Sequence, residues 1–436
     1  MCAPLPNPEP APPQVHTLAN GVRVICDPMP GLETLALSVV AGHGARSEDP
    51  ARGGWSHLLE HMVFKGAGSR SARDIVEVIE AAGGSINAAT GYERTSYQVR
   101  ALKGGLDLGL AVTADLIQRP SLEAGDLARE KQVVIQEIAE AADAPDDLVF
   151  ELAQGEAFMD QALGRPILGV RQTVEAATPQ SLEAWRRYLY APEALVISVA
   201  GAVDVPELLA LADRDFGGAA AAEAAPTPSP ARFVGGTKVT TKALEQANVV
   251  ILMPAVSACD PDYFVLRIYA EILGGGMASR LFQEARERRG LAYAIDAYAE
   301  TYADVGVLGI FAGCSARDAA ELVKVSAGEI AGMSRHVEPA ELARAKAQLK
   351  ASMFMARESA LARAEQAAGQ VLLFGRVLTP LELAAAVDAV TDEDVMRLGE
   401  RILADRRCAV AILGPRSAKA AGETFSRTLF GETSGS

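Results

Sequence analysis

The sequence predicts an α+β protein with two homologous domains, each a mixed or antiparallel β-sheet with flanking helices. Three observations support this prediction. The chain has 436 residues, whereas single hydrophobic cores stop growing near roughly 250 to 300 residues. Residues 217–232, close to the midpoint, are rich in glycine, alanine and proline and show no apolar periodicity, which is typical of a linker. Similar segments also occur in the same order on both sides of that linker.

Two pairs of segments carry the internal similarity. Residues 178–201 align without a gap on residues 391–414, and each segment is typical of an N-capped amphipathic helix followed by a buried strand that ends in glycine. LAREK at 127–131 similarly matches LARAK at 342–346. We therefore expect four parts, namely a flexible arm (1–14), a first domain (15–216), a linker (217–232) and a second domain (233–436).

The elements of the first half follow from local patterns. Asn20-Gly21 between two extended runs predicts a hairpin, and the alternating run at 34–42 predicts a strand. Adjacent strands with helices clustered between them favour α+β over a doubly wound parallel sheet. The remaining expected elements are a helix after Gly54, a helix at 71–82, strands within 85–102, and helices at 122–142 and 147–159.

Composition and charge exclude several classes of protein. Hydrophobic residues make up 49% of the chain and charged residues 22%, as in a folded protein with sizeable cores. The net charge of −15 would repel phosphate backbones, which argues against nucleic acid as a partner, and it agrees with basic peptides as ligands.

The cysteines and the start of the chain bear on the location of the protein. Five scattered cysteines without a C-x-x-C pair favour a reducing compartment. The proline-rich start resembles neither a signal nor a transit peptide, and apolar runs are too short to cross a membrane. We therefore expect a cytoplasmic protein with no membrane partner.

The motif with the clearest chemistry is H-x-x-E-H, formed by His57, Glu60 and His61. Helical positions i and i+4 share one face, so both imidazoles could bind one metal ion, and the glutamate beside them could take a proton from the attacking water. The alternative is a surface helix with two unrelated histidines. The apolar neighbours of the motif disfavour it, because they predict a buried helix whose histidines need partners.

A catalytic zinc site needs a third protein ligand. The long helix expected at 122–142 offers Glu130 and Glu137, which lie two turns apart on one face. A solvated helix face is the alternative for both carboxylates.

The motif, followed 76 residues after its second histidine by a glutamate within EKQVVIQEI, strongly resembles the M16 zinc metallopeptidases, in particular the M16B subfamily with the mitochondrial processing peptidase β subunit and bacterial homologues. The resemblance covers nearly the whole chain, including residues 164–201 and 279–298. It implies the LuxS/MPP-like metallohydrolase fold and one zinc ion per chain, held by His57, His61 and Glu137. It also implies that Glu60 is the general base and that Glu130 supports the ligands.

The resemblance further implies three features that bind substrate. An edge strand, SINAAT, would pair with the substrate backbone, a phenylalanine would line the pocket for the residue after the cut, and two acidic residues would hold an arginine near it. The alternatives are an ordinary strand, core packing and a solvated helix start. The residues concerned are Asn87, Ala88 and Ala89, Phe64, and Asp147 and Glu151.

The second half lacks the metal groups at the corresponding positions. Offsets of 210 and 215 residues place Arg267, Ala270, Glu271, Ala345 and Ser352 opposite His57, Glu60, His61, Glu130 and Glu137.

The resemblance assigns one pair of residues in the second half, Arg286 and Tyr293, to the zinc site. These side chains would donate hydrogen bonds to the substrate carbonyl as it becomes an oxyanion. A surface charge run beside a strand tyrosine is the alternative. Whether the pair acts in its own chain or in a partner is left open.

Together these patterns predict a zinc endopeptidase that acts on peptides or short unfolded segments, with a homodimer as the simplest assembly. The alternatives are a non-catalytic core-type subunit, the catalytic subunit of a heterodimer and a zinc-dependent binding protein.

Overall fold

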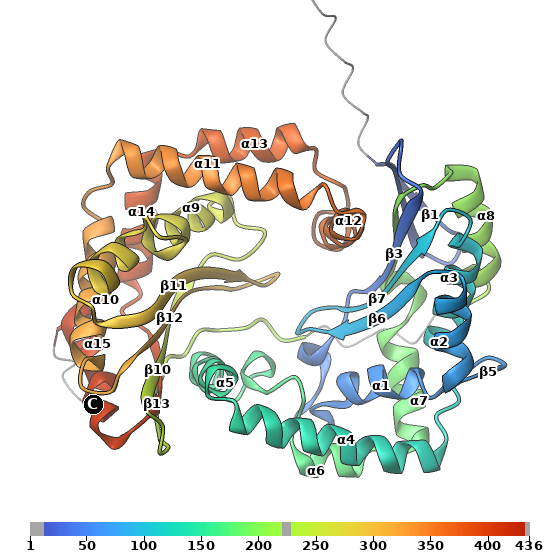
Figure 1. The fold of residues 1–436 in the computed structure, drawn as a ribbon, viewed down its shortest axis with the longest axis horizontal. Coiled ribbons are helices and arrows are strands. Elements are labelled where there is room, and N and C mark those ends of the chain that lie inside the picture. The colour runs from blue at the N-terminus through green and yellow to red at the C-terminus, as the bar shows by residue number, and fades with distance from the viewer. Residues whose placement is uncertain (1–12, 220–227, 432–436) are drawn as a thin grey trace, which may run out of the picture.

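The computed structural model describes residues 13–219 and 228–431. Most of the expected arm at 1–14 and the middle of the expected linker at 217–232 lie outside these described residues. The part before residue 220 forms the first half and the part after residue 227 forms the second half, and the two lie side by side (Figure 1). No helix within these ranges is both long and apolar enough to cross a membrane.

Each half contains one large β-sheet. The first sheet has the order β1-β2-β8-β3-β7-β6, in which β2 and β8 are parallel and the other neighbours antiparallel. The second has the order β11-β12-β10-β13-β9, in which only β13 and β9 are parallel. The strands are β1 (Val15–Thr17), β2 (Arg23–Pro28), β3 (Thr34–Ala41), β6 (Ser85–Thr90), β7 (Thr95–Leu102), β8 (Leu195–Gly201), β9 (Gly236–Thr241), β10 (Gln246–Ala255), β11 (Ala292–Thr301), β12 (Gly306–Ser315) and β13 (Ala409–Gly414), besides the short pair β4 (Gly66–Ala67) and β5 (Arg70–Ser71).

The two sheets repeat one topology. The series β2-β8-β3-β7-β6 has the same order and the same parallel and antiparallel neighbours as β9-β13-β10-β12-β11. Thr178 and Thr391, which the sequence aligns, both cap a helix through a capping box, and that helix leads into β8 or β13. The prediction of an α+β fold with two homologous domains is confirmed.

Helices cover both sheets (Figure 1). The expected helix at 71–82 is α2, which ends before Gly83 (φ of +73°), and those at 122–142 and 147–159 are α4 and α5. The helices are α1 (Trp55–Val63), α2 (Ala72–Ala81), α3 (Leu106–Gln118), α4 (Ala124–Asp143), α5 (Pro145–Ala157), α6 (Arg171–Ala176), α7 (Pro179–Leu189), α8 (Val205–Phe216), α9 (Tyr263–Gly274), a π-helical segment η5 (Phe282–Arg288), α10 (Ala319–Met333), α11 (Pro339–Ala356), α12 (Ala360–Phe374), α13 (Pro380–Ala389), α14 (Asp392–Ala404) and α15 (Ala421–Phe430).

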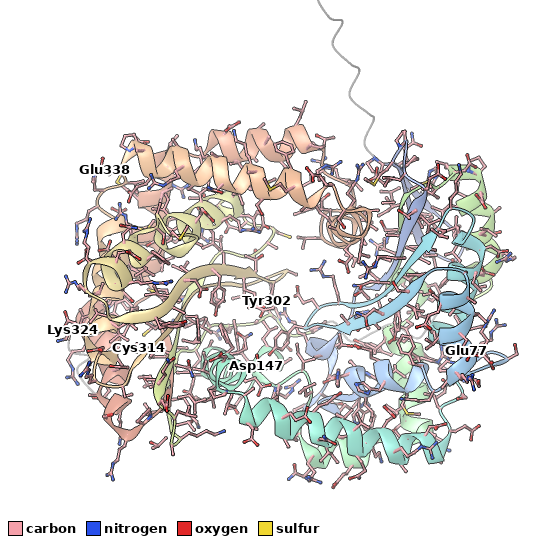
Figure 2. The ribbon with its side chains drawn as sticks, in the orientation of Figure 1. Glu77, Asp147, Tyr302, Cys314, Lys324 and Glu338 are labelled. Atoms are coloured by element: carbon pink, nitrogen blue, oxygen red, sulfur yellow. The ribbon has the colours of Figure 1, made fainter. Side chains whose placement is uncertain are left out.

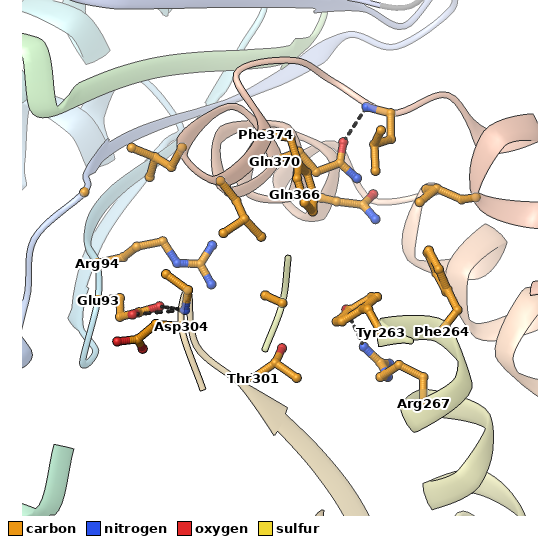
Figure 3. A pocket seen from close by; sticks show the side chains of 18 of the residues that line it. Glu93, Arg94, Tyr263, Phe264, Arg267, Thr301, Asp304, Gln366, Gln370 and Phe374 are labelled. Atoms are coloured by element: carbon orange, nitrogen blue, oxygen red, sulfur yellow. Dashed lines mark hydrogen bonds between the residues drawn. The ribbon is translucent and has the colours of Figure 1, made fainter. Parts of the chain in front are cut away.

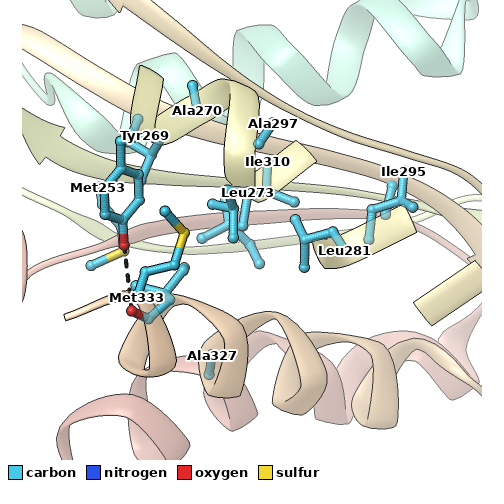
Figure 4. Close-up of a cluster of buried hydrophobic side chains, with 14 of the residues drawn as sticks. Met253, Tyr269, Ala270, Leu273, Leu281, Ile295, Ala297, Ile310, Ala327 and Met333 are labelled. Atoms are coloured by element: carbon cyan, nitrogen blue, oxygen red, sulfur yellow. Dashed lines mark hydrogen bonds between the residues drawn. The ribbon is translucent and has the colours of Figure 1, made fainter. Parts of the chain in front are cut away.

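Each half has its own apolar core between its sheet and its helices. In the second half, the fully buried ring of Tyr269 packs near Met253 and Met333, and its hydroxyl donates a hydrogen bond to the carbonyl of Ile330 at 3.4 Å (Figure 4). The hydroxyl therefore has a partner although it is buried, as burial of a tyrosine requires.

The halves also exchange one helix each. Helix α5 of the first half packs on β10 and β13, where Val149 and Ala153 join a core with strand residues such as Val250. Helix α12 of the second half packs on β2, β3 and β8, where Ala368 and Val371 are buried. Figure 1 shows α12 beside β3, and α5 below β11. Because each sheet needs a helix from the other half, the exchange fixes the two halves relative to each other.

Candidate active site

Helix α1, which carries the H-x-x-E-H motif, begins at a tightly packed turn. Gly54 precedes it with a φ of +86°, and a Cβ atom there would lie 2.4 Å from the carbonyl oxygen of Leu168, so only glycine fits. The buried carboxylate of Glu48 accepts the N–H groups of Gly54 at 2.8 Å and Ser56 at 2.7 Å. Two of the N–H groups at the helix start are thereby satisfied, and the helix axis is held in place.

Opposite the motif lies α4, which supplies the third side chain. Nε2 of His61 is 3.5 Å and Nε2 of His57 is 3.9 Å from Oε2 of Glu137. The two imidazole rings have their centroids 4.7 Å apart, and one ligand atom from each of the three residues lies within 4.8 Å of the others. Among the described residues this is the one such group that could hold a metal ion.

The donor set fits zinc on physical grounds. Oε2 of Glu137 is buried without a hydrogen-bond partner in the described part of the chain, although it faces both rings. A buried carboxylate oxygen without a partner is costly unless a cation binds it. Burial, and secondarily the neighbouring His61, lowers the pKa of His57 to about 4, so its ring is neutral near pH 7, which is the form that binds metal. Two imidazoles and one carboxylate match a catalytic zinc site with an open fourth position.

Glu130 supports this group from behind. Its Oε2 lies 3.1 Å from Nδ1 of His61, and its Oε1 lies 2.9 Å from Nζ of Lys65. The carboxylate is buried and thus well placed to orient the imidazole ring. The sequence did not indicate Lys65, since a lysine just after a helix is usually only solvated.

Glu60 lies on the same face of α1, next to the three ligands. The hydroxyl of Thr90 donates a hydrogen bond to its Oε2 at 2.5 Å. Burial raises the pKa of Glu60. Thr90 is the last residue of SINAAT, and its contact with Glu60 was not predicted, because sequence alone does not show which strand approaches the helix.

The predicted substrate strand is β6, at the edge of the first sheet. Asn87 and Ala88 pair with Gln98 and Tyr97 of β7, and no described strand pairs with the outer side of β6. Its outer backbone groups are therefore available to an extended peptide. Phe64 ends α1 and packs partly buried against the core of the first half, with its ring centroid 6.4 Å from that of Tyr97.

The two predicted acidic residues lie on α5. Asp147 is exposed and Glu151 is half-buried, and the pKa of Glu151 is raised first by burial and then by Asp147. Figure 2 shows Asp147 on α5 near the centre of the molecule, where Tyr302 also lies. The structure thus places them on the exchanged helix.

The structure does not bring Arg286 and Tyr293 to the metal ligands. Arg286 lies in η5, 4.7 Å above the ring of Phe282, and Tyr293 is 76% exposed at the start of β11. The halves meet at the other end of this strand, where the N–H of Ala303 donates to Glu93. Eight residues of β11 separate Tyr293 from Thr301, just before Ala303, which corresponds to roughly 26 Å.

The fold and these ligands place the chain in the class of metal-dependent hydrolases. The family model described as Insulinase (Peptidase family M16) matches residues 23–171, and that described as Peptidase M16 inactive domain matches residues 176–349.

Individual relatives agree with the family models. A Rickettsia bellii protein named as an uncharacterized zinc protease is 35% identical over 405 residues, which cover 92% of this chain and 98% of that protein. A Streptomyces coelicolor protein with a similar name is 33% identical over 414 residues, covering 93% and 90%. A Helicobacter pylori protease structure has a TM-score of 0.86 at 21% identity, covering 93% of this chain and all of that one, and it supports the fold. The chain belongs to peptidase family M16, the zinc metallopeptidases.

Proposed function

We propose that the protein is a zinc endopeptidase of the M16B type, similar to the processing peptidases, which cleaves peptides or short unfolded segments and binds one zinc ion per chain. The observation that carries the proposal is the cluster of His57, His61 and Glu137 with Glu60 beside it. Zinc, when bound there, would supply a Lewis acid for the scissile carbonyl and the attacking water.

The residues of the chain would do the rest of the chemistry. Glu60 takes a proton from the attacking water and passes it to the leaving amine, and its raised pKa favours that role. Thr90 holds one carboxylate oxygen, which leaves the other free for the water. A peptide paired with the outer edge of β6 would lie next to this carboxylate, because Thr90 belongs to that strand.

A homodimer would complete the site. The distance along β11 argues against Tyr293 reaching the metal ligands of its own chain, so we assign Arg286 and Tyr293 to the site of the partner subunit. Since the chain retains the whole metal-ligand group, a non-catalytic core-type subunit is disfavoured. In the alternative of a heterodimer, a different chain would take the place of the partner subunit.

The test compares wild type with Glu60→Gln on a diverse peptide mixture, with bound zinc measured in both. Because Glu60→Gln removes the general base, the rate of peptide cleavage should fall by roughly 100-fold or more while zinc is retained. Glu140→Gln on the exposed face of α4 is the matched control and should cleave like wild type. Unchanged cleavage by the zinc-loaded Glu60→Gln protein would refute the mechanism.

A further inference from the structure

A cavity of about 870 Å³ lies where the two halves meet (Figure 3). Helices α9, α11 and α12 of the second half line it, together with the turn between β6 and β7 of the first half. The described residues that line it do not include His57, Glu60, His61 or Glu137. The cavity is thus separate from the metal site.

Its position corresponds to that of the metal site in the duplicated fold. Arg267 on α9 and Ser352 on α11 both line the cavity, and they occupy the positions of His57 and Glu137 in the first half. Helices α9 and α11 pack on each other as α1 and α4 do. The second half has therefore lost the metal groups and kept a space between the same two helices.

The charges on the cavity wall favour an anion. Glu93 and Asp304 are both paired with the buried Arg46, at 2.6 and 2.5 Å. Arg94 and Arg267 are exposed and form no ion pair with any described residue, and the one hydrogen bond of the Arg267 side chain there is to the hydroxyl of Tyr263 at 3.2 Å. Three arginines against two carboxylates leave the lining at +1, although the whole chain carries −15.

The remaining wall is apolar with a few amide groups. Figure 3 shows Arg94 and Arg267 on opposite sides of the cavity, with Gln366 and Gln370 on α12 between them. Gln370 accepts the N–H of Leu378 at 2.9 Å through its Oε1, which leaves its NH₂ group free, and Gln366 has no hydrogen-bond partner in the described part of the chain. Side-chain amides can both donate to and accept from peptide groups. The apolar part is lined by Phe264, Leu349, Met353, Leu373, Phe374 and Leu383.

We propose that this cavity binds the C-terminal end of a short apolar peptide. Arg94 and Arg267, which face the cavity from opposite sides, make its electrostatic potential positive and so attract the free carboxylate. Gln366 and Gln370 bind the peptide backbone, and the peptide side chains cover the apolar wall. That the ligand is a peptide rests on the proposed peptidase function. Recognition of a carboxylate on an apolar body rests on the cavity alone.

Calorimetric titration of the full-length chain tests the proposal. The Glu60→Gln form is used so that no peptide is cleaved, and the probes are acetyl-Ala-Leu-Phe with a free carboxylate, the same peptide as its C-terminal amide, and dodecanoate. The free acid should bind about tenfold more tightly than the amide. Arg94→Gln and Arg267→Gln should each reduce that preference, and the double variant should remove most of it. Arg100→Gln, an exposed arginine on β7 outside the cavity, should leave it unchanged.

The outcomes of this titration test the cavity independently of the proposed peptidase activity. Equal binding of acid and amide, or binding that Arg94→Gln and Arg267→Gln leave unaltered, would overturn the proposal whether or not the protein is a peptidase. Arginine-dependent binding of dodecanoate without binding of the peptide acid would overturn the peptide assignment. Loss of peptide binding in His57→Ala, with no effect of the arginine substitutions, would place the peptide at the metal site instead.

Discussion

Nδ1 of His61 lies 3.1 Å from Oε2 of Glu130, so that the other ring nitrogen, Nε2, points to Glu137 at 3.5 Å. A carboxylate behind a metal-binding imidazole fixes both the ring orientation and the tautomer. Lys65 pairs with the second oxygen of Glu130 and keeps the carboxylate in place. The imidazole of His61 is therefore oriented toward the zinc position before any metal binds.

Glu130→Gln should weaken zinc binding by about 10- to 100-fold, because the amide holds the ring less firmly and loses the ion pair with Lys65. Competition with a zinc chelator measures the change. Glu140→Gln, elsewhere on α4, is the control and should bind zinc like wild type. Equal zinc affinity in the Glu130→Gln protein would show that the contact does not orient the ligand.

Stability should depend on pH through Glu48. Burial raises the pKa of Glu48 from 4.5 to about 7, against the effect of its hydrogen bonds from Ser56 and Gly54. The pKa of Glu48 is higher in the folded than in the unfolded protein, so binding of its proton stabilises the folded state. This stabilisation is complete below pH 4.5 and is lost as the pH rises through about 7. Glu48→Gln stays neutral. The free energy of unfolding of wild type should therefore fall relative to this variant by about 3 kcal/mol between pH 4.5 and 8.

Urea unfolding of the metal-free proteins at several pH values measures this difference. Glu140→Gln, which removes an exposed carboxylate, should show no such trend. A difference between wild type and Glu48→Gln that stays constant over the whole range would contradict the raised pKa.

Much of the fold could be predicted from the sequence because the duplication repeats local signals. The aligned threonines at 178 and 391 do cap equivalent helices. Helix α3 was not predicted. It is buried on nearly all sides, so its sequence lacks the apolar stripe of an amphipathic helix, and Gly109 lies within it.

The candidate site was predicted where ligand chemistry constrains the spacing of the residues. The motif on α1 and the glutamate on α4 can be recognised in the sequence, and the structure brings their side chains together. Glu48 contacts the same helix from a position that no pattern marks. Thr90 belongs to the predicted edge strand, but the sequence does not show that it contacts Glu60. The exchange of α5 and α12 was likewise not foreseen, because periodicity shows which face of a helix is apolar and not which sheet it covers.

The exchanged helix α12 should depend on a buried ion pair. Nε and Nη2 of Arg363 each donate to Asp27 of β2 at 2.6 Å, and the side chains are 17% and 9% exposed. Arg363→Met should lower the free energy of unfolding by about 3 kcal/mol, since it leaves the carboxylate unpaired. The double variant with Asp27→Asn should lose less than the sum of the single changes.

Chemical denaturation of the four proteins gives the coupling energy between the two side chains. Arg73→Met breaks the exposed pair with Glu77 and should cost less than about 1 kcal/mol. Additive effects of Asp27→Asn and Arg363→Met would show that the ion pair does not hold α12 on the first sheet.

Cleavage preference should report on Asp147 and Glu151. If they hold a basic side chain, cut sites in a diverse peptide mixture, mapped by mass spectrometry, should be enriched in arginine at one position near the cut. Asp147→Asn with Glu151→Gln should abolish that enrichment, because the two carboxylates supply the attraction. Asp143→Asn at the exposed end of α4 is the control. Absence of arginine enrichment in wild type would remove the two residues from the substrate site.

The placement of Arg286 and Tyr293 can be tested by combining two inactive chains. Glu60→Gln destroys the site on its own chain, and Tyr293→Phe should lower cleavage by about 100-fold by removing an oxyanion donor. If Tyr293 serves the partner subunit, each mixed dimer has one intact site. With equal co-expression of the two chains, half of the dimers contain one chain of each kind, and one of the two sites in each such dimer is intact. About a quarter of wild-type activity should therefore be restored. No recovery in dimers of verified composition would mean that Tyr293 acts within its own chain, and a monomeric active enzyme would exclude the dimer itself.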